Sequence, residues 1–315
     1  MLQYRRSMRA ERKSILSLKK IFSACLSLTL FTVSFSASAM DCAFCNRQPV
    51  GPARLPGFET PKGTSNWFSS VILDESQYFE IKVTRGAFVP FYFLIISKEH
   101  LLRAADLTPE MMSDLMMLKN KIERFYTEVL QTPFVVFEHG PRADGERSGE
   151  NCSVDGGGGC VDHLHLHILP FAGDLESTLE EVQPDRFEVA VKLESLDEMT
   201  GSQFFFKPYI FYQNPTGQMT MRVVKNPIRS QLFRLLIANE MGIEDEFNWR
   251  EFTDRGDFWA NGAHSVVAYM SWKSSGPAAA RELIKGKNWA ERVSGTPKLL
   301  GSWSCDQTLG VKSAR

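Results

Sequence analysis

Residues 162–170 read Asp162-His163-Leu164-His165-Leu166-His167-Ile168-Leu169-Pro170, so imidazole and aliphatic side chains alternate along the stretch. Alternation at period two is typical of a half-buried β-strand, because successive side chains on a strand point to opposite faces. The pattern predicts a strand with His163, His165 and His167 on one face and the aliphatic residues in a core. A row of imidazoles can supply a nucleophile, a proton donor and a metal ligand near neutral pH. A histidine-rich tract that only binds metal is the other interpretation.

A glycine run, Gly156-Gly157-Gly158-Gly159-Cys160, lies just upstream, and its backbone can approach and cradle a phosphate. Together with this run, His-Leu-His-Leu-His-Ile-Leu at 163–169 resembles the signature of the histidine-triad (HIT) family. The resemblance implies an α+β fold, with an antiparallel sheet of about five strands, flanking helices and a C-terminal α+β extension.

The resemblance also implies roles for the site residues. His165, the middle histidine, is the nucleophile that attacks phosphorus and forms a phospho-histidine intermediate, and His167 meets the phosphoryl oxygens. His163 orients this face. The substrate-binding residues are expected before the triad, and they are Glu138, His139, Gly158, Gly159 and Cys160. Glu138 and His139 stand where many family members carry an asparagine before a glycine.

A Cys-x-x-Cys motif, Cys42-Ala43-Phe44-Cys45, precedes the first expected strand. In company with the triad it resembles the zinc-carrying type of the family, whose ligand set would here be Cys42, Cys45, His100 and His163. Two thiolates and two imidazoles form the closed tetrahedral shell that a structural zinc needs. A Cys42–Cys45 disulfide is the rival, and a Cys152–Cys160 bridge is a further open alternative.

Residues 1–39 combine a basic start, a short apolar run and Ala37-Ser38-Ala39, which together predict a signal peptide and export. We expect no stable membrane insertion after cleavage. Residues 1–39 hold seven of the 36 basic residues and one of the 37 acidic ones, so the remainder has a net charge of −7. An acidic chain is a poor binder of long nucleic acid, which favours a small phosphorylated or nucleotide-like substrate as partner. A homodimer is a further partner prediction.

The expected organisation after the signal peptide is a HIT domain at 40–182, an extension of a hairpin plus a helix at 183–252, and an unassigned tail at 253–315. Hydrophobic patterns and turn signals predict these elements. Strands are expected at 67–73, 78–83, 88–96 and 134–137, a helix from Thr108-Pro109 to 129, a short helix at 174–182, a hairpin of 204–212 with 219–224, and a helix at 227–241.

The function predicted from these features is a hydrolase, or a nucleotidyltransferase-like enzyme, that acts on phosphorus through His165. The alternative is a zinc-stabilised nucleotide- or ligand-binding module without turnover.

Overall fold

The computed structural model describes residue 44 and residues 71–141, 163–182, 185–201, 204, 206–248 and 256–285. By its internal contacts the chain divides into residues 1–41 and residues 42–315, and all described residues belong to the second unit.

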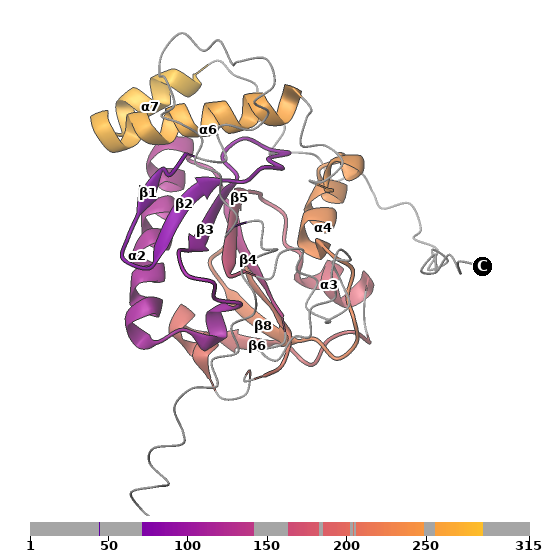
Figure 1. The fold of residues 1–315 in the computed structure, drawn as a ribbon. Coiled ribbons are helices and arrows are strands. Elements are labelled where there is room, and N and C mark those ends of the chain that lie inside the picture. The colour runs from indigo at the N-terminus through magenta and orange to yellow at the C-terminus, as the bar shows by residue number, and fades with distance from the viewer. Residues whose placement is uncertain are drawn as a thin grey trace, which may run out of the picture. The chain divides into compact units, whose positions relative to one another are not determined.

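The centre of this unit is one antiparallel sheet with the strand order β1-β2-β3-β5-β4-β7-β8-β6 (Figure 1). The sheet has eight strands, so the prediction of about five was wrong. The described strands are β1 (Asp74–Glu75), β2 (Phe79–Val83), β3 (Phe93–Ser97), β4 (Phe134–Gly140), β5 (His165–Pro170), β6 (Val191–Leu193), β7 (Tyr209–Gln213) and β8 (Met219–Val223).

The additional strands come from the predicted extension. The hairpin β7–β8 is confirmed, and its turn is held by Asn214, whose Oδ1 accepts hydrogen bonds from the amides of Thr216 and Gln218 at 3.1 and 2.9 Å. β7 pairs with the outer edge of β4, and β6 then pairs with β8. An exposed edge leaves backbone amides and carbonyls without partners, which pairing with β7 removes. The sheet therefore runs across the predicted boundary at residue 182.

Helix α2 (Pro109–Phe125) packs against β2 and β3 on one face of the sheet. Its predicted start is confirmed, since the Thr108 side chain caps the helix by accepting from the Met111 amide at 3.3 Å and Pro109 takes the first position. The helix ends in a π-helical turn, η4 (Tyr126–Leu130). Apolar residues at helical spacing face the sheet and are buried: Met112, Leu115, Leu118, Ile122 and Phe125.

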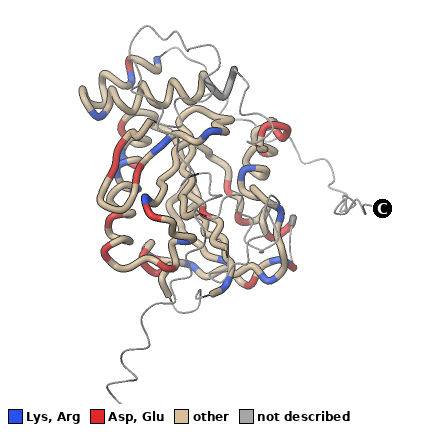
Figure 2. Tube along the Cα trace, viewed as in Figure 1, with Lys and Arg blue, Asp and Glu red and all other residues tan. Residues whose placement is uncertain are grey.

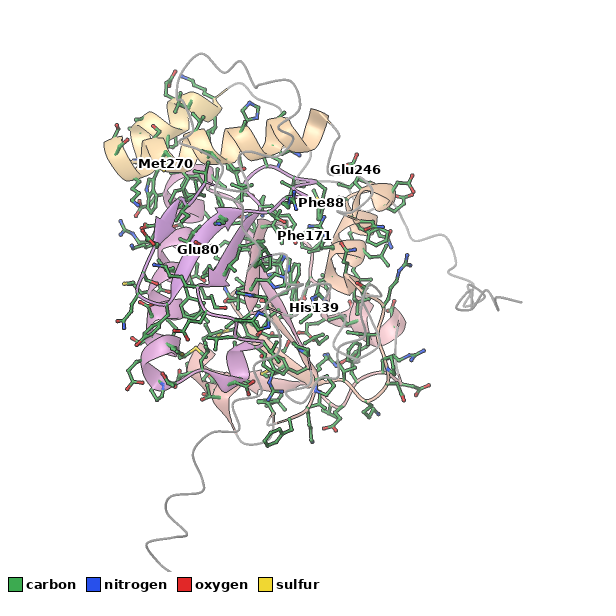
Figure 3. All side chains as sticks on the ribbon, viewed as in Figure 1. Glu80, Phe88, His139, Phe171, Glu246 and Met270 are labelled. Atoms are coloured by element: carbon green, nitrogen blue, oxygen red, sulfur yellow. The ribbon has the colours of Figure 1, made fainter. Side chains whose placement is uncertain are left out.

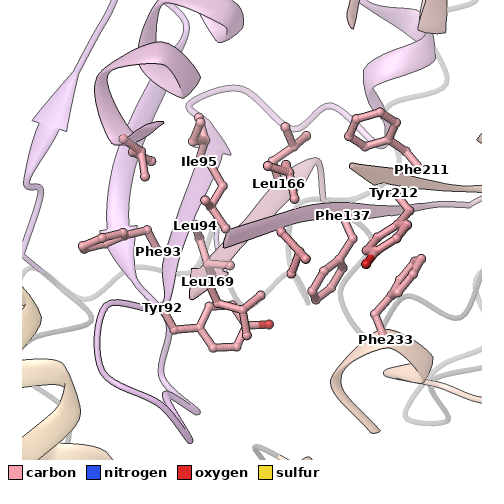
Figure 4. Close-up of a cluster of buried hydrophobic side chains, with 14 of the residues drawn as sticks. Tyr92, Phe93, Leu94, Ile95, Phe137, Leu166, Leu169, Phe211, Tyr212 and Phe233 are labelled. Carbon is pink, nitrogen blue, oxygen red and sulfur yellow. The ribbon is translucent and has the colours of Figure 1, made fainter. Parts of the chain in front are cut away.

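The opposite face carries α3 (Glu176–Val182) and α4 (Leu232–Glu240), so the sheet lies between α2 and the pair α3–α4 in Figure 1. The Phe233 ring of α4 stacks on Phe137 of β4 at 4.8 Å and on Tyr212 of β7 at 5.4 Å between ring centroids (Figure 4). Helix α4 is thereby packed on the strand next to β5.

The predicted unassigned tail contributes two helices, α6 (Gly256–Ser275) and α7 (Pro277–Ile284). Tyr269 of α6 packs on Phe93 and Phe125, with ring centroids 5.6 and 5.4 Å apart. The tail thus joins the α2 side of the core. Three short 3₁₀ helices complete the described elements: η3 (Ala104–Asp106), η5 (Leu196–Thr200) and η7 (Glu244–Glu246).

Three strand predictions were wrong in extent. The first arm of the hairpin, expected from residue 204, begins only at Tyr209. In place of a strand at 67–73, the structure begins β1 at Asp74, and residues 67–70 lie outside the described part. The expected strand at 88–96 begins only at Phe93, because Phe91 has a left-handed backbone with φ 64°, outside the extended conformation of a regular strand.

Acidic and basic residues are interspersed over the described elements in Figure 2, while the central strands consist mainly of uncharged residues. Among the described helices, none combines the length and apolar character needed to cross a membrane.

Candidate active site on the histidine face of the sheet

Strand β5 places His165 and His167 on one face, with their ring centroids 4.7 Å apart. Leu166 and Ile168 are fully buried on the other face, in the core under α2. The predicted alternation is confirmed from His165 onward, because the strand begins there and His163 precedes it. Two imidazoles therefore share one small surface.

The His165 ring is held in one protonation pattern by the backbone. Its Nδ1 lies 2.6 Å from the carbonyl oxygen of His163, and a carbonyl can only accept, so Nδ1 carries the proton. Nε2 then holds the lone pair. The ring is half-buried, and burial lowers the pKa of His165, so the imidazole is neutral near pH 7. A neutral imidazole with an unprotonated Nε2 is the form that attacks phosphorus.

His167 is enclosed by aromatic rings. Phe137 stacks on it at 4.4 Å between centroids and 13° between planes, and the Tyr92 hydroxyl lies 2.8 Å from its Nδ1. Burial, with smaller contributions from His165, His139 and Arg234, holds the pKa of His167 well below its ordinary value. His167 is therefore a neutral hydrogen-bonding group in a fixed orientation.

His139 joins the same face from β4. Strand alternation places it beside Phe137, whose ring it meets edge-on at 5.8 Å, and Phe233 covers it at 5.2 Å. The side chain, labelled in Figure 3, is buried, and its Nε2 has no hydrogen-bond partner among the described residues. Burial, followed by the nearby His165, lowers the pKa of His139 to about 3. His139 is therefore a neutral imidazole on the same face as His165 and His167, and its contact with substrate stays a prediction.

Glu138 lies on the opposite face from the histidines. Its carboxylate accepts hydrogen bonds from the Ala104 amide at 2.8 Å and from the Tyr209 hydroxyl at 3.0 Å. The Tyr209 ring covers Gly140, where a Cβ would approach its carbons to 2.3 Å. Burial raises the pKa of Glu138 to about 7, against the lowering effects of the two hydrogen bonds and of Arg103. The structure thus separates Glu138 from the histidines. The prediction that Glu138 contacts substrate is therefore corrected: its carboxylate holds η3 in place.

His100 and His163 lie together, with ring centroids 5.3 Å apart. The Nε2 of His163 donates to the Ser97 carbonyl at 2.7 Å, so Nδ1 is the unprotonated nitrogen, as a metal ligand requires. Phe44 packs against the rings of His163 and His165 at 5.4 and 5.2 Å, which brings the centre of the Cys-x-x-Cys motif to the histidines. The two imidazoles of the predicted ligand set therefore lie side by side.

The other half of that set, Cys42 and Cys45, lies outside the described residues, as do Gly158, Gly159, Cys160 and the Cys152 alternative. Among the residues that the structure does describe, no three histidine, cysteine or acidic side chains form a metal-binding group.

Sequence reasoning missed the aromatic enclosure of the site. Tyr92, Phe137 and Phe233 surround His167 and His139, and they come from three segments far apart in the chain. The sequence pattern around each of these aromatic residues predicts an ordinary core residue. The one available signal was Arg234, a charge inside the apolar run Leu232–Ala238.

A groove of about 810 Å³ runs along α2, bordered by Met116, Met117 and Asp197 among other residues. No histidine lines it, and α2 covers the sheet face opposite to His165. The chemistry of the histidines therefore belongs to a different surface.

Comparison with known proteins finds similarity over part of the chain. A search of curated proteins finds no match. Two solved structures of a yeast enzyme are similar. Ap4A phosphorylase in complex with AMP has a TM-score of 0.30 and 15% identity over 51% of this chain and 62% of that chain. The same enzyme with Ap4A has a TM-score of 0.30 and 14% identity over 47% and 57%. This chain thus spans less than two thirds of that enzyme. The HIT domain family model matches residues 68–173, about a third of the chain, and these residues include β5 with its histidines.

Proposed function

We propose that this protein is a histidine-triad enzyme that breaks a phosphoramidate or phosphoanhydride bond of a small nucleotide-like substrate. The observation that carries the proposal is the hydrogen bond from His165 Nδ1 to the His163 carbonyl, inside a segment that matches the HIT domain. That bond leaves the lone pair of the neutral imidazole on Nε2.

The proposed reaction has two displacements at phosphorus. His165 Nε2 forms a bond to phosphorus while the bond to the leaving group breaks, and the leaving group departs with the bonding electrons and takes up a proton. Water then attacks the same phosphorus, loses a proton, and releases His165 with its lone pair restored. In this reaction His139 and His167, two neutral imidazoles on the same face as His165, each offer a ring N–H that stabilises the charge developing on the phosphoryl oxygens.

The proposal is tested by trapping the intermediate. The protein is mixed with a panel of nucleoside 5′-phosphoramidates that differ in the base, and the intact mass is recorded within the first turnovers. We expect a mass increase of one nucleotidyl group in the wild type and none in His165→Ala. His264→Ala, at a histidine of α6 and outside the sheet, is the matched control and should keep the adduct. No adduct and no turnover in the wild type would favour the binding module without turnover.

We also propose a structural zinc held by Cys42, Cys45, His100 and His163. Its support is the adjacency of the two imidazoles, the unprotonated Nδ1 of His163 and the contact of Phe44 with both rings. A bound zinc would cross-link the N-terminal motif to the loop after β3 and the start of β5.

The zinc proposal predicts about one zinc per chain by elemental analysis of the purified protein. His100→Ala should lose most of the metal, and a strong chelator should lower the thermal midpoint of the wild type by several degrees but leave that of His100→Ala nearly unchanged. A metal-free wild type with a Cys42–Cys45 disulfide in its peptide map would contradict the zinc assignment.

The signal peptide at 1–39, export and the homodimer stay predictions, because they concern residues or partners that the described structure does not contain. We propose export on the basis of the N-terminal sequence alone.

A further inference from the structure

Helix α4 reaches His167 from two sides, although it lies beyond the segment that matches the HIT domain. On one side Phe233 stacks on Phe137, which itself stacks on the His167 ring. On the other side Arg234 lies over the ring of Tyr92, whose hydroxyl contacts His167 Nδ1. Neighbouring residues of one helix turn thus support both partners of the same imidazole.

Arg234 is almost completely buried, with 3% of its surface exposed. Its Nη2 donates to the Gly86 carbonyl at 2.7 Å and its Nε to the Phe247 carbonyl at 2.8 Å. Its guanidinium carbon lies 4.8 Å from the centre of the Phe88 ring and 5.2 Å from that of Tyr92. A guanidinium in this setting fixes the segment from Gly86 to Tyr92 by hydrogen bonds and by cation–π contacts.

Helix α6 holds the same segment at two further points. Ser265 Oγ accepts from the Phe91 amide at 2.6 Å, and Asn261 Nδ2 donates to the Ala87 carbonyl at 2.8 Å. Phe91 has φ 64°, a conformation that a residue with a side chain adopts only when its surroundings enforce it. The residue next to it is Tyr92. The C-terminal helices therefore determine where the Tyr92 hydroxyl lies.

We propose that Arg234 is a positioning residue for His167, and that it acts through Tyr92 to keep the imidazole in the tautomer with the proton on Nε2. The guanidinium over the Tyr92 ring has donors only, so it offers the Tyr92 hydroxyl no acceptor, and the hydroxyl hydrogen is directed to Nδ1. The hydroxyl keeps this hydrogen, because burial raises the pKa of Tyr92 to about 12 while Arg234 opposes the rise. Nδ1 then accepts, and the His167 proton resides on Nε2.

This assignment gives the C-terminal part of the chain a role in the reaction. Under the proposed function, on which this step rests, His167 presents an N–H donor to the phosphoryl oxygens while His165 presents a lone pair to phosphorus. The two adjacent imidazoles have opposite tautomers, each set by a different partner: the His163 carbonyl for one and the Tyr92 hydroxyl for the other. A shift of the His167 proton to Nδ1 would turn a lone pair toward the anionic substrate.

The experiment compares Arg234→Met, Arg234→Lys and Tyr92→Phe with the wild type in two measurements. The tautomer of His167 is read from ¹⁵N NMR of histidine-labelled protein without substrate, with the signals assigned by a His167→Gln spectrum. Steady-state kinetics on the nucleoside phosphoramidates give kcat and KM separately. Arg222→Met is the matched control, since Arg222 is also a buried arginine on this face but pairs with Glu176 and Glu180 of α3.

We expect Arg234→Met and Tyr92→Phe to move His167 toward the Nδ1–H tautomer and to lower kcat about 10-fold to 100-fold with little change in KM. Arg234→Lys should keep part of the wild-type tautomer population and part of the wild-type kcat. Arg222→Met should change neither the tautomer nor kcat. A wild-type tautomer in Tyr92→Phe, which retains the ring packing, would overturn the proposal, and so would an equal shift in Arg222→Met. Because the NMR measurement needs no substrate, a tautomer shift in protein that forms no adduct would refute the proposed function and leave the positioning role standing.

Discussion

A His165→Gly variant is expected to lose at least about 10⁴-fold in kcat/KM on nucleoside phosphoramidates, and to regain part of its turnover when free imidazole is added. The loss follows because no other described group presents an imidazole lone pair at the same point of β5. Imidazole can enter the space that the ring leaves between Phe44 and His167 and attack phosphorus in its place. The measurement is product formation as a function of imidazole concentration.

The matched control is His264→Ala in α6, which avoids a glycine inside the helix and should keep the wild-type rate. A His165→Gly rate close to the wild-type rate would mean that the nucleophile is another residue. A large loss without any recovery in imidazole, in a variant with a wild-type thermal midpoint, would argue against nucleophilic attack and for a purely electrostatic role of the ring.

The parts of the fold that could be predicted from sequence are those in which local pattern and local chemistry agree. Strand β5 shows strict alternation, and α2 begins with a threonine cap and a proline and continues with apolar residues at helical spacing. In both, the information lies within a few residues of the element itself. The same holds for the hairpin β7–β8, whose turn carries Asn214 and Gly217, the latter at φ 87°.

Strand pairing could not be predicted in this way, because alternation identifies a strand but not its neighbour. β7 pairs with β4 although some 70 residues separate them, since β4 would otherwise present an unpaired edge. Glu138 and His139 illustrate the same limit within one strand. Side chains alternate along a strand, so only one of two adjacent residues can lie on the face that carries the histidines of β5. The register of β4 places His139 on that face.

The support of His167 depends on contacts of still longer range. Tyr92 sits in an aromatic-rich run that reads as a continuous strand, yet Phe91 interrupts the strand because Ser265 of α6 binds its amide. Arg234 lies in an apolar helix, where a buried charge is costly unless it is well paired. Its partners are carbonyls and aromatic rings from two loops, which a local pattern does not reveal.

Arg103 supplies the second large expected effect, this time on stability. Its fully buried guanidinium pairs with both Asp106 oxygens at 2.7 Å and donates to the Lys207 carbonyl at 2.8 Å, so it ties η3 to the segment before β7. Arg103→Met should lower the free energy of unfolding by about 3–5 kcal/mol, because buried acceptors and the nearby Glu138 lose their cation. Denaturant unfolding measures this cost.

The cost of Arg103→Met should also depend on pH, because Arg103 opposes the raised pKa of Glu138, which is about 7 in the folded protein and 4.5 for an ordinary glutamate. The folded state therefore binds more protons than the unfolded state between these values, and stability falls as pH rises from 4.5 through 7. Without Arg103 the pKa of Glu138 rises further, so the stability of the protein keeps falling up to a higher pH. Each unit added to that pKa costs about 1.4 kcal/mol of stability at high pH. Arg103→Met should thus be more destabilising at pH 8 than at pH 5.5.

Two further variants separate this electrostatic coupling from lost packing. Combining Arg103→Met with Glu138→Gln should remove the difference between pH 8 and pH 5.5 while most of the cost at pH 5.5 remains, because the carbonyl acceptors still lack their donor. Arg222→Met removes a buried arginine that has no contact with Glu138, so its cost should be similar at the two pH values. An equal cost of Arg103→Met at both pH values would mean that the Glu138 carboxyl titrates independently of Arg103, and that η3 is held by hydrogen bonds alone.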